Sequence, residues 1–184
     1  MSALRRTGGF TLIELLVTVA VIAILAAVAA PNMMSFLDRN RVVGAAEAVY
    51  AQVQSARSEA VKQGANMTVV FSSGSSWCAG FARGAGVCDC TAALGATDAC
   101  SVLGDGQNSI LTVVANGPFT GVGMDGGAPA SLTFDGVRGT VAGGGGAASF
   151  TSAEGRQLQV AVNALGRVRL CSPGGSVGGY PTCN

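Results

Sequence analysis

Histidine is absent from this chain of 184 residues, and Lys62 is its one lysine. Charged residues make up 11% of the sequence, against about 25% in an ordinary domain. Without histidine, most catalytic and metal-binding sites are hard to build. The sequence also lacks a nucleophile motif and a glycine-rich phosphate loop ahead of a helix. We therefore expect neither an enzyme nor a bound cofactor or metal.

Net charge also narrows the possible functions. The chain carries 11 basic and 10 acidic side chains, a formal net charge of +1. If residues 1–9 are removed, Arg5 and Arg6 go with them, and 9 basic side chains remain against 10 acidic ones, a net of −1. A nearly neutral protein does not attract nucleic acid over its whole surface, so such binding requires a local basic patch.

The first 31 residues contain the most informative pattern. Two arginines precede Gly9-Phe10, one acidic residue follows at Glu14, and the chain is then apolar as far as Ala30. As a helix, residues 11–30 span about 30 Å, which matches the hydrocarbon core of a bilayer. The positive-inside rule places the basic end in the cytoplasm and the rest of the chain outside. A carboxylate inside a bilayer costs about 2.5–3.5 kcal/mol, so Glu14 is expected to have a partner.

This pattern resembles the class III leader of type IV pilins and type II secretion pseudopilins. The resemblance implies that a prepilin peptidase cuts after Gly9 and that the new N-terminal Phe10 is methylated. It further implies that Glu14 pairs with the methylated amine of a neighbouring subunit during fibre assembly. Two alternatives stay open: a classical secretory signal cut near residues 26–30, and a solvated glutamate without a function.

Beyond Pro31, which is expected to kink the helix, the apolar residues keep a helical period. They recur at spacings of 4, 3, 4, 3 and 4, which predicts an amphipathic helix with one buried face. The helix is expected to end at Gln63, with Gly64 as its C-cap. The residues of the predicted buried face are Val42, Ala46, Val49, Val53, Ala56 and Ala60.

After Gly64 the pattern changes to short apolar runs separated by Gly, Ser and Asp, which predicts an antiparallel β unit packed on the apolar face of the helix. The fold class is therefore α+β. The expected parts are a leader (1–9), a transmembrane half-helix (10–30), an amphipathic half-helix (31–63) and a β-rich domain (64–184). A flexible hairpin loop is expected at 143–146. The predicted strands are 67–71, 110–115, 131–134, 148–151, 157–163 and 167–171.

Three segments of this part, VYAQVQSARSEAVKQG, LTFDGVRG and LQVAVNALGRVRL, together with the leader, resemble the FimT/GspH group of minor pilins and pseudopilins. The resemblance implies a minor pilin of a type IV pilus, with a GspH-type pseudopilin of type II secretion as the alternative. It implies other pilins or pseudopilins as partners. It also implies a single-pass protein of the bacterial inner membrane whose C-terminal domain is periplasmic before it joins the fibre.

Six cysteines in an exported chain predict three disulfides. Four of them form a cluster in which Cys78 and Cys88, and Cys90 and Cys100, are each separated by nine residues. A zinc site is the alternative, but tetrathiolate ligands usually pair two to four residues apart. Three disulfide pairings are possible, and we favour Cys78–Cys88 with Cys90–Cys100 because both loops are short and local.

Two aromatic residues, Trp77 and Phe81, lie beside this cysteine cluster. They have two interpretations: a contact surface for a partner, or packing beneath the stapled loop. Of the two, we favour packing.

The C-terminal residues predict a second covalent loop. Cys171 and Cys183 are expected to close a loop of 13 residues, which in the chain-entropy model stabilises by about 3 kcal/mol. The loop contains almost no apolar residue, so we expect the disulfide to supply its order.

The segment GRVR at 166–169 directly precedes that loop. Alternation along a strand puts Arg167 and Arg169 on one face, about 7 Å apart. The segment resembles the GRxR signature of FimT-type minor pilins that bind DNA during natural transformation. This implies weak, salt-dependent, sequence-independent binding to double-stranded DNA, with Tyr180 available for stacking. An ordinary solvated strand face is the alternative. Two further arginines are candidates to enlarge the patch: Arg138 and Arg156.

Overall fold

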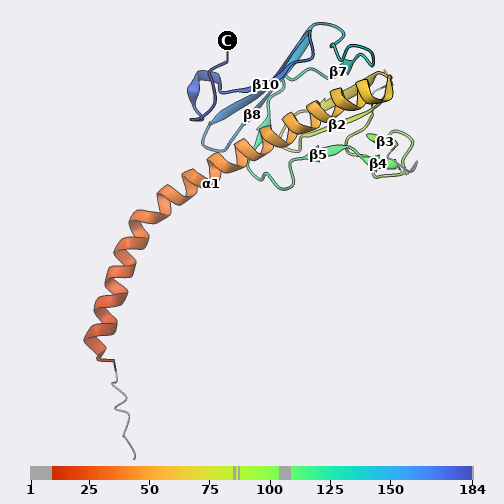
Figure 1. The fold of residues 1–184 in the computed structure, drawn as a ribbon. Coiled ribbons are helices and arrows are strands. Elements are labelled where there is room, and N and C mark those ends of the chain that lie inside the picture. Colours follow the sequence, from red (N-terminus) through yellow and green to blue (C-terminus); the bar gives the residue numbers. More distant parts are fainter. Residues whose placement is uncertain (1–9, 85, 87, 104–108, 184) are drawn as a thin grey trace, which may run out of the picture. The chain divides into compact units, whose positions relative to one another are not determined.

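The computed structural model describes residues 10–84, 86, 88–103 and 109–183, with the main chain alone at 29–32. Its first element is one helix, α1 (Leu12–Gln63), of 52 residues. The chain divides into two compact units between Leu37 and Asp38, so α1 contributes to both (Figure 1).

In the first unit, α1 is apolar on every side. Each described large apolar side chain from Phe10 to Leu37 is at least 42% exposed. Within the described residues no single helix is both long and apolar enough to span a membrane. The two parts of α1 on either side of residues 29–32 are long and apolar enough only when they are taken together. These parts are Leu12–Val28 and Met33–Gln63, and the criterion is one of length and composition alone. A helix that is apolar all round needs lipid or other helices around it.

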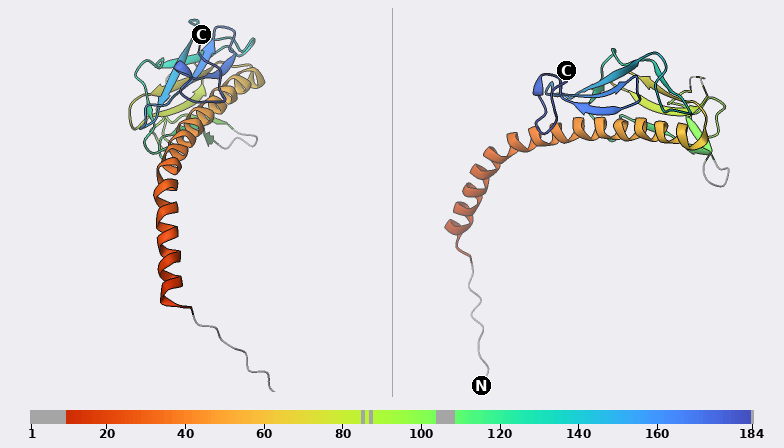
Figure 2. Two further views of the ribbon diagram at one scale, coloured as in Figure 1. Left: turned by 90° about the vertical axis from the view of Figure 1, so that its left-hand side faces the viewer. Right: turned by 45° about the horizontal axis from the view of Figure 1, so that its top comes forward.

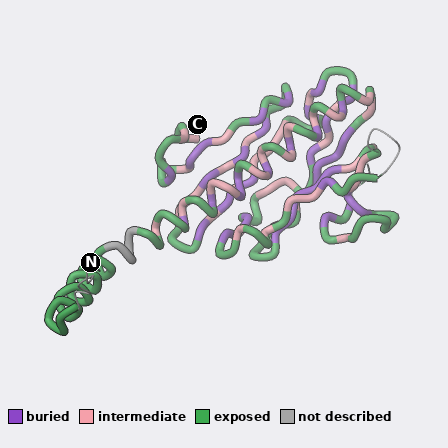
Figure 3. The backbone as a smooth tube through the Cα atoms, turned by 60° about the horizontal axis from the view of Figure 1, so that its bottom comes forward, coloured by how far each residue is buried: buried purple, intermediate pink, exposed green. Residues whose placement is uncertain are grey.

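In the second unit, one face of α1 is buried against the β structure, whereas the first half of the helix is exposed (Figure 3). All six residues of the predicted buried face are fully buried, and Ala45 joins them. The helix ends in a Schellman motif, in which Gly64 adopts φ 60° and the amide of Ala65 donates to the carbonyl of Ala60. The predicted helix, its buried face and its glycine cap are confirmed.

The described strands pair antiparallel in three sheets. Sheet A has the order β5 (Val113–Ala115), β2 (Cys78–Arg83), β1 (Met67–Ser72) and β7 (Ser131–Phe134). Sheet B has the order β10 (Val168–Cys171), β9 (Gln157–Asn163), β8 (Gly145–Thr151) and β6 (Gly123–Met124). A ribbon is formed by β3 (Ser101–Leu103) and β4 (Ser109–Leu111).

The second half of α1 lies along one face of these sheets (Figure 2), and a single apolar core fills the space between them. Trp77, Phe134, Phe150, Met67 and Leu158 are the largest fully buried side chains. The α+β class predicted from the sequence is confirmed, with two main sheets in place of one β unit.

Two strand predictions are corrected by the structure. Residues 110–115 are not one strand, because at Thr112 the chain leaves β3 and joins β2: its amide donates to the Cys100 carbonyl (2.9 Å), and its carbonyl accepts from Phe81 (3.1 Å). The hairpin loop at 143–146 is also wrong. Gly145 and Gly146 belong to β8, and a Cβ on Gly145 would lie 2.2 Å from a carbonyl oxygen of β9.

Candidate functional site

The two arginines of the GRVR segment lie on one exposed face, as the alternation predicted. Val168 between them is 6% exposed and packs into the core, while Arg167 and Arg169 are exposed. Together with Asn163 they line a pocket of about 210 Å³. The two guanidinium groups give the lining a positive charge, which favours an anionic group such as a phosphate or a carboxylate.

Asn163 holds the turn that presents this pocket. Its side-chain oxygen accepts the Arg167 amide at 2.9 Å, and its own amide donates to the Arg167 carbonyl at 3.1 Å. The turn closes at Gly166, whose amide donates to the Asn163 carbonyl at 2.9 Å. Asn163 was not predicted as a functional residue, although asparagine at the first position and glycine at the fourth are typical of a type I turn.

Gly166 permits a close approach between two turns. Its φ is +74°, and a Cβ at this position would lie 2.0 Å from the carbonyl oxygen of Gly139. That same oxygen accepts a hydrogen bond from Nε of Arg57 on α1, at 3.1 Å. The pocket therefore rests on a compact corner formed by α1, the turn 135–139 and the turn 163–167.

Of the two arginines expected to enlarge the patch, one lies in this corner and the other does not. Arg138 is exposed within the turn 135–139, where Asp135 accepts its amide at 2.8 Å. Arg156 instead lies 3.6 Å from the carboxylate of Asp38 and 3.4 Å from that of Glu154. Its charge is offset by two carboxylates, so it adds little to a surface for anions.

Tyr180 is committed to α1 and not to the arginine pocket. Its hydroxyl donates to Glu47 Oε1 at 2.5 Å, and its ring packs against the core. Partial burial and the Glu47 carboxylate raise the pKa of Tyr180 to about 12. The stacking role expected for this ring would require it to leave that contact, so the sequence expectation does not fit the structure.

Tyr180 belongs to the C-terminal loop, which Cys171 and Cys183 close with a disulfide as expected. The disulfide expected to supply the loop's order is present, but it is not the only contact that does so. Val177 is fully buried in the core, and Nη2 of Arg39 donates to the Gly178 carbonyl at 2.8 Å. The loop is therefore fastened to α1 by side-chain contacts as well as by the covalent bond.

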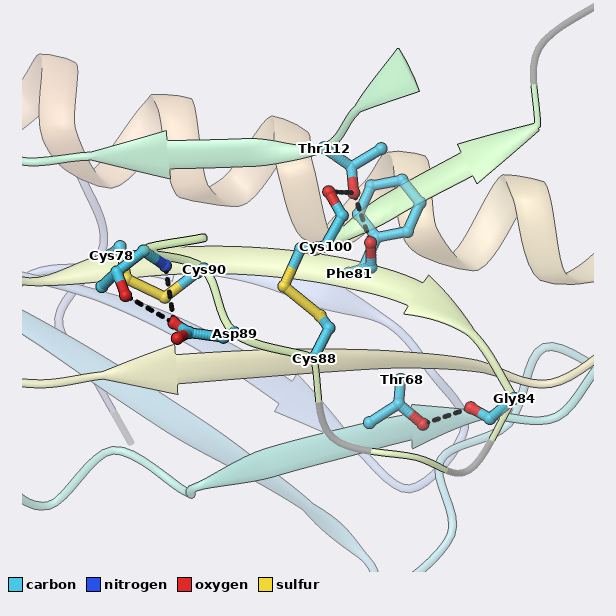
Figure 4. Close-up of a disulfide and its surroundings, with 10 residues drawn as sticks. Thr68, Cys78, Phe81, Gly84, Cys88, Asp89, Cys90, Cys100 and Thr112 are labelled. Carbon is cyan, nitrogen blue, oxygen red and sulfur yellow. Dashed lines mark hydrogen bonds between the residues drawn. A yellow bond between two sulfur atoms is a disulfide. The ribbon is translucent and has the colours of Figure 1, made fainter. Parts of the chain in front are cut away.

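The four cysteines of the cluster are paired as Cys78–Cys90 and Cys88–Cys100 (Figure 4). The favoured local pairing is wrong, and disulfides stand where the zinc alternative would have placed thiolates. No group of three or more possible ligands that could hold a metal occurs in the described part of the chain.

Strand direction explains the crossed pairing. Cys78 begins β2, and Cys100 packs beside the middle of β2, where a Cβ on Gly80 would lie 2.8 Å from its sulfur. After β2 the chain returns in the opposite direction. Cys88 therefore lies near Cys100, beside the middle of β2, and Cys90 lies near Cys78, at the start of β2. These disulfides form a small buried cluster of their own with Val70.

The two aromatic residues beside the cluster are packed, as we favoured, and form no contact surface. Trp77 is fully buried, and Phe81 is 3% exposed. The Trp77 indole donates to the Val122 carbonyl at 2.9 Å. Its ring stacks on Phe119 at 6.0 Å and meets the edge of Phe150 at 5.1 Å.

At the N-terminus, Phe10 and Glu14 are both exposed, and Gly9 lies outside the described residues. Thr11 is the N-cap of α1, and its hydroxyl accepts the amide of Glu14 at 3.3 Å. Thr-x-x-Glu at the start of a helix is the spacing of a capping box, which marks Thr11 as a helix start in the sequence as well. An acidic residue in the first turn also complements the helix dipole.

Comparison with known proteins adds to this geometry. Residues 45–166 match the family model described as type II transport protein GspH. Residues 4–30 match the prokaryotic N-terminal methylation motif. No curated protein matches the chain. Among solved structures, the type IV minor pilin FimU of Pseudomonas aeruginosa PAO1 is similar, with 22% identity and a TM-score of 0.52. The match covers 75% of this chain and 96% of the FimU chain.

Proposed function

The chain belongs to the GspH family of pseudopilins and minor pilins, structural proteins and not enzymes, and we propose that it is a minor pilin of a type IV pilus. The observation that carries the proposal is α1, whose first half is apolar on every side behind a methylation motif. The fold shared with the minor pilin FimU is consistent with it. The alternative within the same family is a pseudopilin of type II secretion.

In this proposal a prepilin peptidase removes residues 1–9 and the amine of Phe10 is methylated. The helix then anchors the protein in the bacterial inner membrane, with the second unit in the periplasm, until the subunit enters the fibre. Glu14 pairs with the methylated Phe10 amine of a neighbouring subunit. Such a pair is favourable at low dielectric because a carboxylate left alone there is costly.

Two variants test processing and assembly separately. Gly9→Ala should block removal of the leader, which intact mass spectrometry would report; a protein cut after residue 9 at the normal rate would reject the site. Glu14→Ala should be cut and inserted normally but absent from sheared fibres, and normal incorporation would reject the pairing.

Deletion of the gene should reduce piliation and leave type II secretion intact, whereas the opposite result would favour the pseudopilin.

A second candidate function is binding of double-stranded DNA at the pocket lined by Asn163, Arg167 and Arg169. The observation that favours it is the pair of guanidinium groups on one exposed face. So few phosphate contacts imply weak binding that falls as salt rises. The test is a salt titration of duplex binding by the oxidised mature chain in neutral detergent. The double variant R167A/R169A should lose binding and R41A should keep it; equal binding by all three would reject the site.

A further inference from the structure

The two faces of the β structure that point away from α1 differ. On sheet A, the cysteine cluster covers the outer side of Val70. On sheet B, the outward residues of β8 and β9 stay partly exposed and carry no charge: Ala147, Ser149, Gln157, Gln159 and Ala161. The charges next to them are those of Arg169 on β10 and of Arg167 directly before it. The open face of sheet B is therefore neutral with a positive border.

That border is also the edge of the sheet, because β10 is the outermost strand of sheet B. The Arg167 carbonyl bonds inward to Asn163, and Arg169 stands opposite Ala161 in the same ladder. In an antiparallel pair the hydrogen-bonded residues alternate. Val168 and Leu170 therefore direct their N–H and C=O groups outward, away from β9.

One end of this outer edge is already occupied by the chain itself. The Ser172 amide donates to the Pro181 carbonyl at 2.8 Å, and Ser172 forms a parallel bridge with Thr182. No hydrogen bond within the described residues uses the outward groups of Val168 and Leu170. Two donors and two acceptors thus remain along the edge, in the register that an added strand requires.

We propose that the edge of β10 binds an extended segment of another protein that carries carboxylates at alternate positions. The segment adds a strand to sheet B through Val168 and Leu170, and its carboxylates meet Arg167 and Arg169. Residues i and i+2 of a strand lie on the same face, about 7 Å apart. Carboxylates at alternate positions of the added strand therefore have the same spacing as Arg167 and Arg169 opposite them. The inference rests on the proposed function in one respect: the other protein is taken to be another subunit of the fibre.

Amide hydrogen exchange of the oxidised mature chain in neutral detergent tests the proposal, with a short capped peptide of alternating Val and Glu as the probe. At ten times its dissociation constant, the peptide should slow exchange of the Val168 and Leu170 amides about tenfold. The Arg169 amide, already in the ladder, should change little. Two peptides serve as controls, each N-methylated at alternate residues, one at the odd and one at the even positions. Because only alternate N–H groups of the added strand face β10, one of the two peptides should lose binding.

Charge is tested separately. R167Q/R169Q should weaken peptide binding between about twofold and thirtyfold, as expected for two exposed ion pairs, while R41Q should not. The proposal is overturned if the peptide does not bind. It is also overturned if the peptide binds without protecting the two amides, or if both methylated forms bind as well as the parent. DNA binding with no peptide binding would leave the second candidate function standing and remove strand addition. Failure of the fibre role would leave the amide protection unchanged.

Discussion

Replacing Gly166 by alanine should lower the free energy of unfolding for two reasons, a strained backbone conformation and a steric clash between two turns beside the arginine pocket. In the left-handed region an alanine costs about 1–2 kcal/mol more than glycine. At Gly166 the added Cβ would also lie 2.0 Å from the Gly139 carbonyl oxygen. Ordinary contact is about 3.4 Å, so the two turns must separate by more than an ångström.

Such a shift breaks the hydrogen bonds that join the corner. The Arg57 side chain bonds the Gly139 carbonyl at 3.1 Å, and the Val141 amide bonds the Ala164 carbonyl at 2.9 Å. At about 1 kcal/mol each, their loss adds about 2 kcal/mol. Gly166→Ala should therefore lower the free energy of unfolding by about 3–4 kcal/mol.

Gly155→Ala is the matched control. Gly155 has φ +78°, close to that of Gly166, but a Cβ there would meet no atom within 4 Å. It should cost only the conformational part, about 1–2 kcal/mol. Denaturant unfolding can be followed by the fluorescence of the single, fully buried Trp77. Equal destabilisation by the two variants would refute the close-packing argument.

Three further predictions concern the core and the C-terminal loop. Burial and the Glu47 carboxylate raise the pKa of Tyr180 from 10.0 to about 12, so the stability that its neutral form contributes should be complete below pH 10 and lost as the pH rises toward 12. Tyr180→Phe should remove this dependence of unfolding on alkaline pH, and an unchanged profile would contradict the burial of Tyr180 against Glu47. The double variant C171A/C183A should lose about 3 kcal/mol of stability in thermal unfolding and expose the loop to protease; undiminished resistance would mean that the contacts with α1 suffice. Trp77→Phe removes an indole hydrogen bond to a main-chain carbonyl and should cost about 1–3 kcal/mol, measured by calorimetry, and a neutral effect would count against that bond.

The helix could be predicted almost to the residue because its signals are local. Apolar residues at a period near 3.6 mark one face, and Gly64 supplies the cap that only a residue tolerant of positive φ supplies easily. The alternation around Val168 likewise placed both arginines on one face. In each case the residues that decide the structure are neighbours in the sequence.

The failures share a different cause. β2 has no β-branched residue and was not predicted. Its Gly80 is required because Cys100 packs against it, a contact between residues far apart in the chain. The disulfide pairing depends on the same contact, through the direction in which the chain returns along β2. Tyr180 was assigned to the wrong surface because its partner Glu47 is 133 residues away.

The layer of disulfides over sheet A also makes completion of the fold depend on redox conditions. On the outer side of sheet A, cystine sulfurs lie against Val70, Gly80 and Ala82. A reduced chain would lack the two covalent links, Cys78–Cys90 and Cys88–Cys100, that hold this layer together. The packing over this face is therefore complete only under conditions in which the disulfides persist.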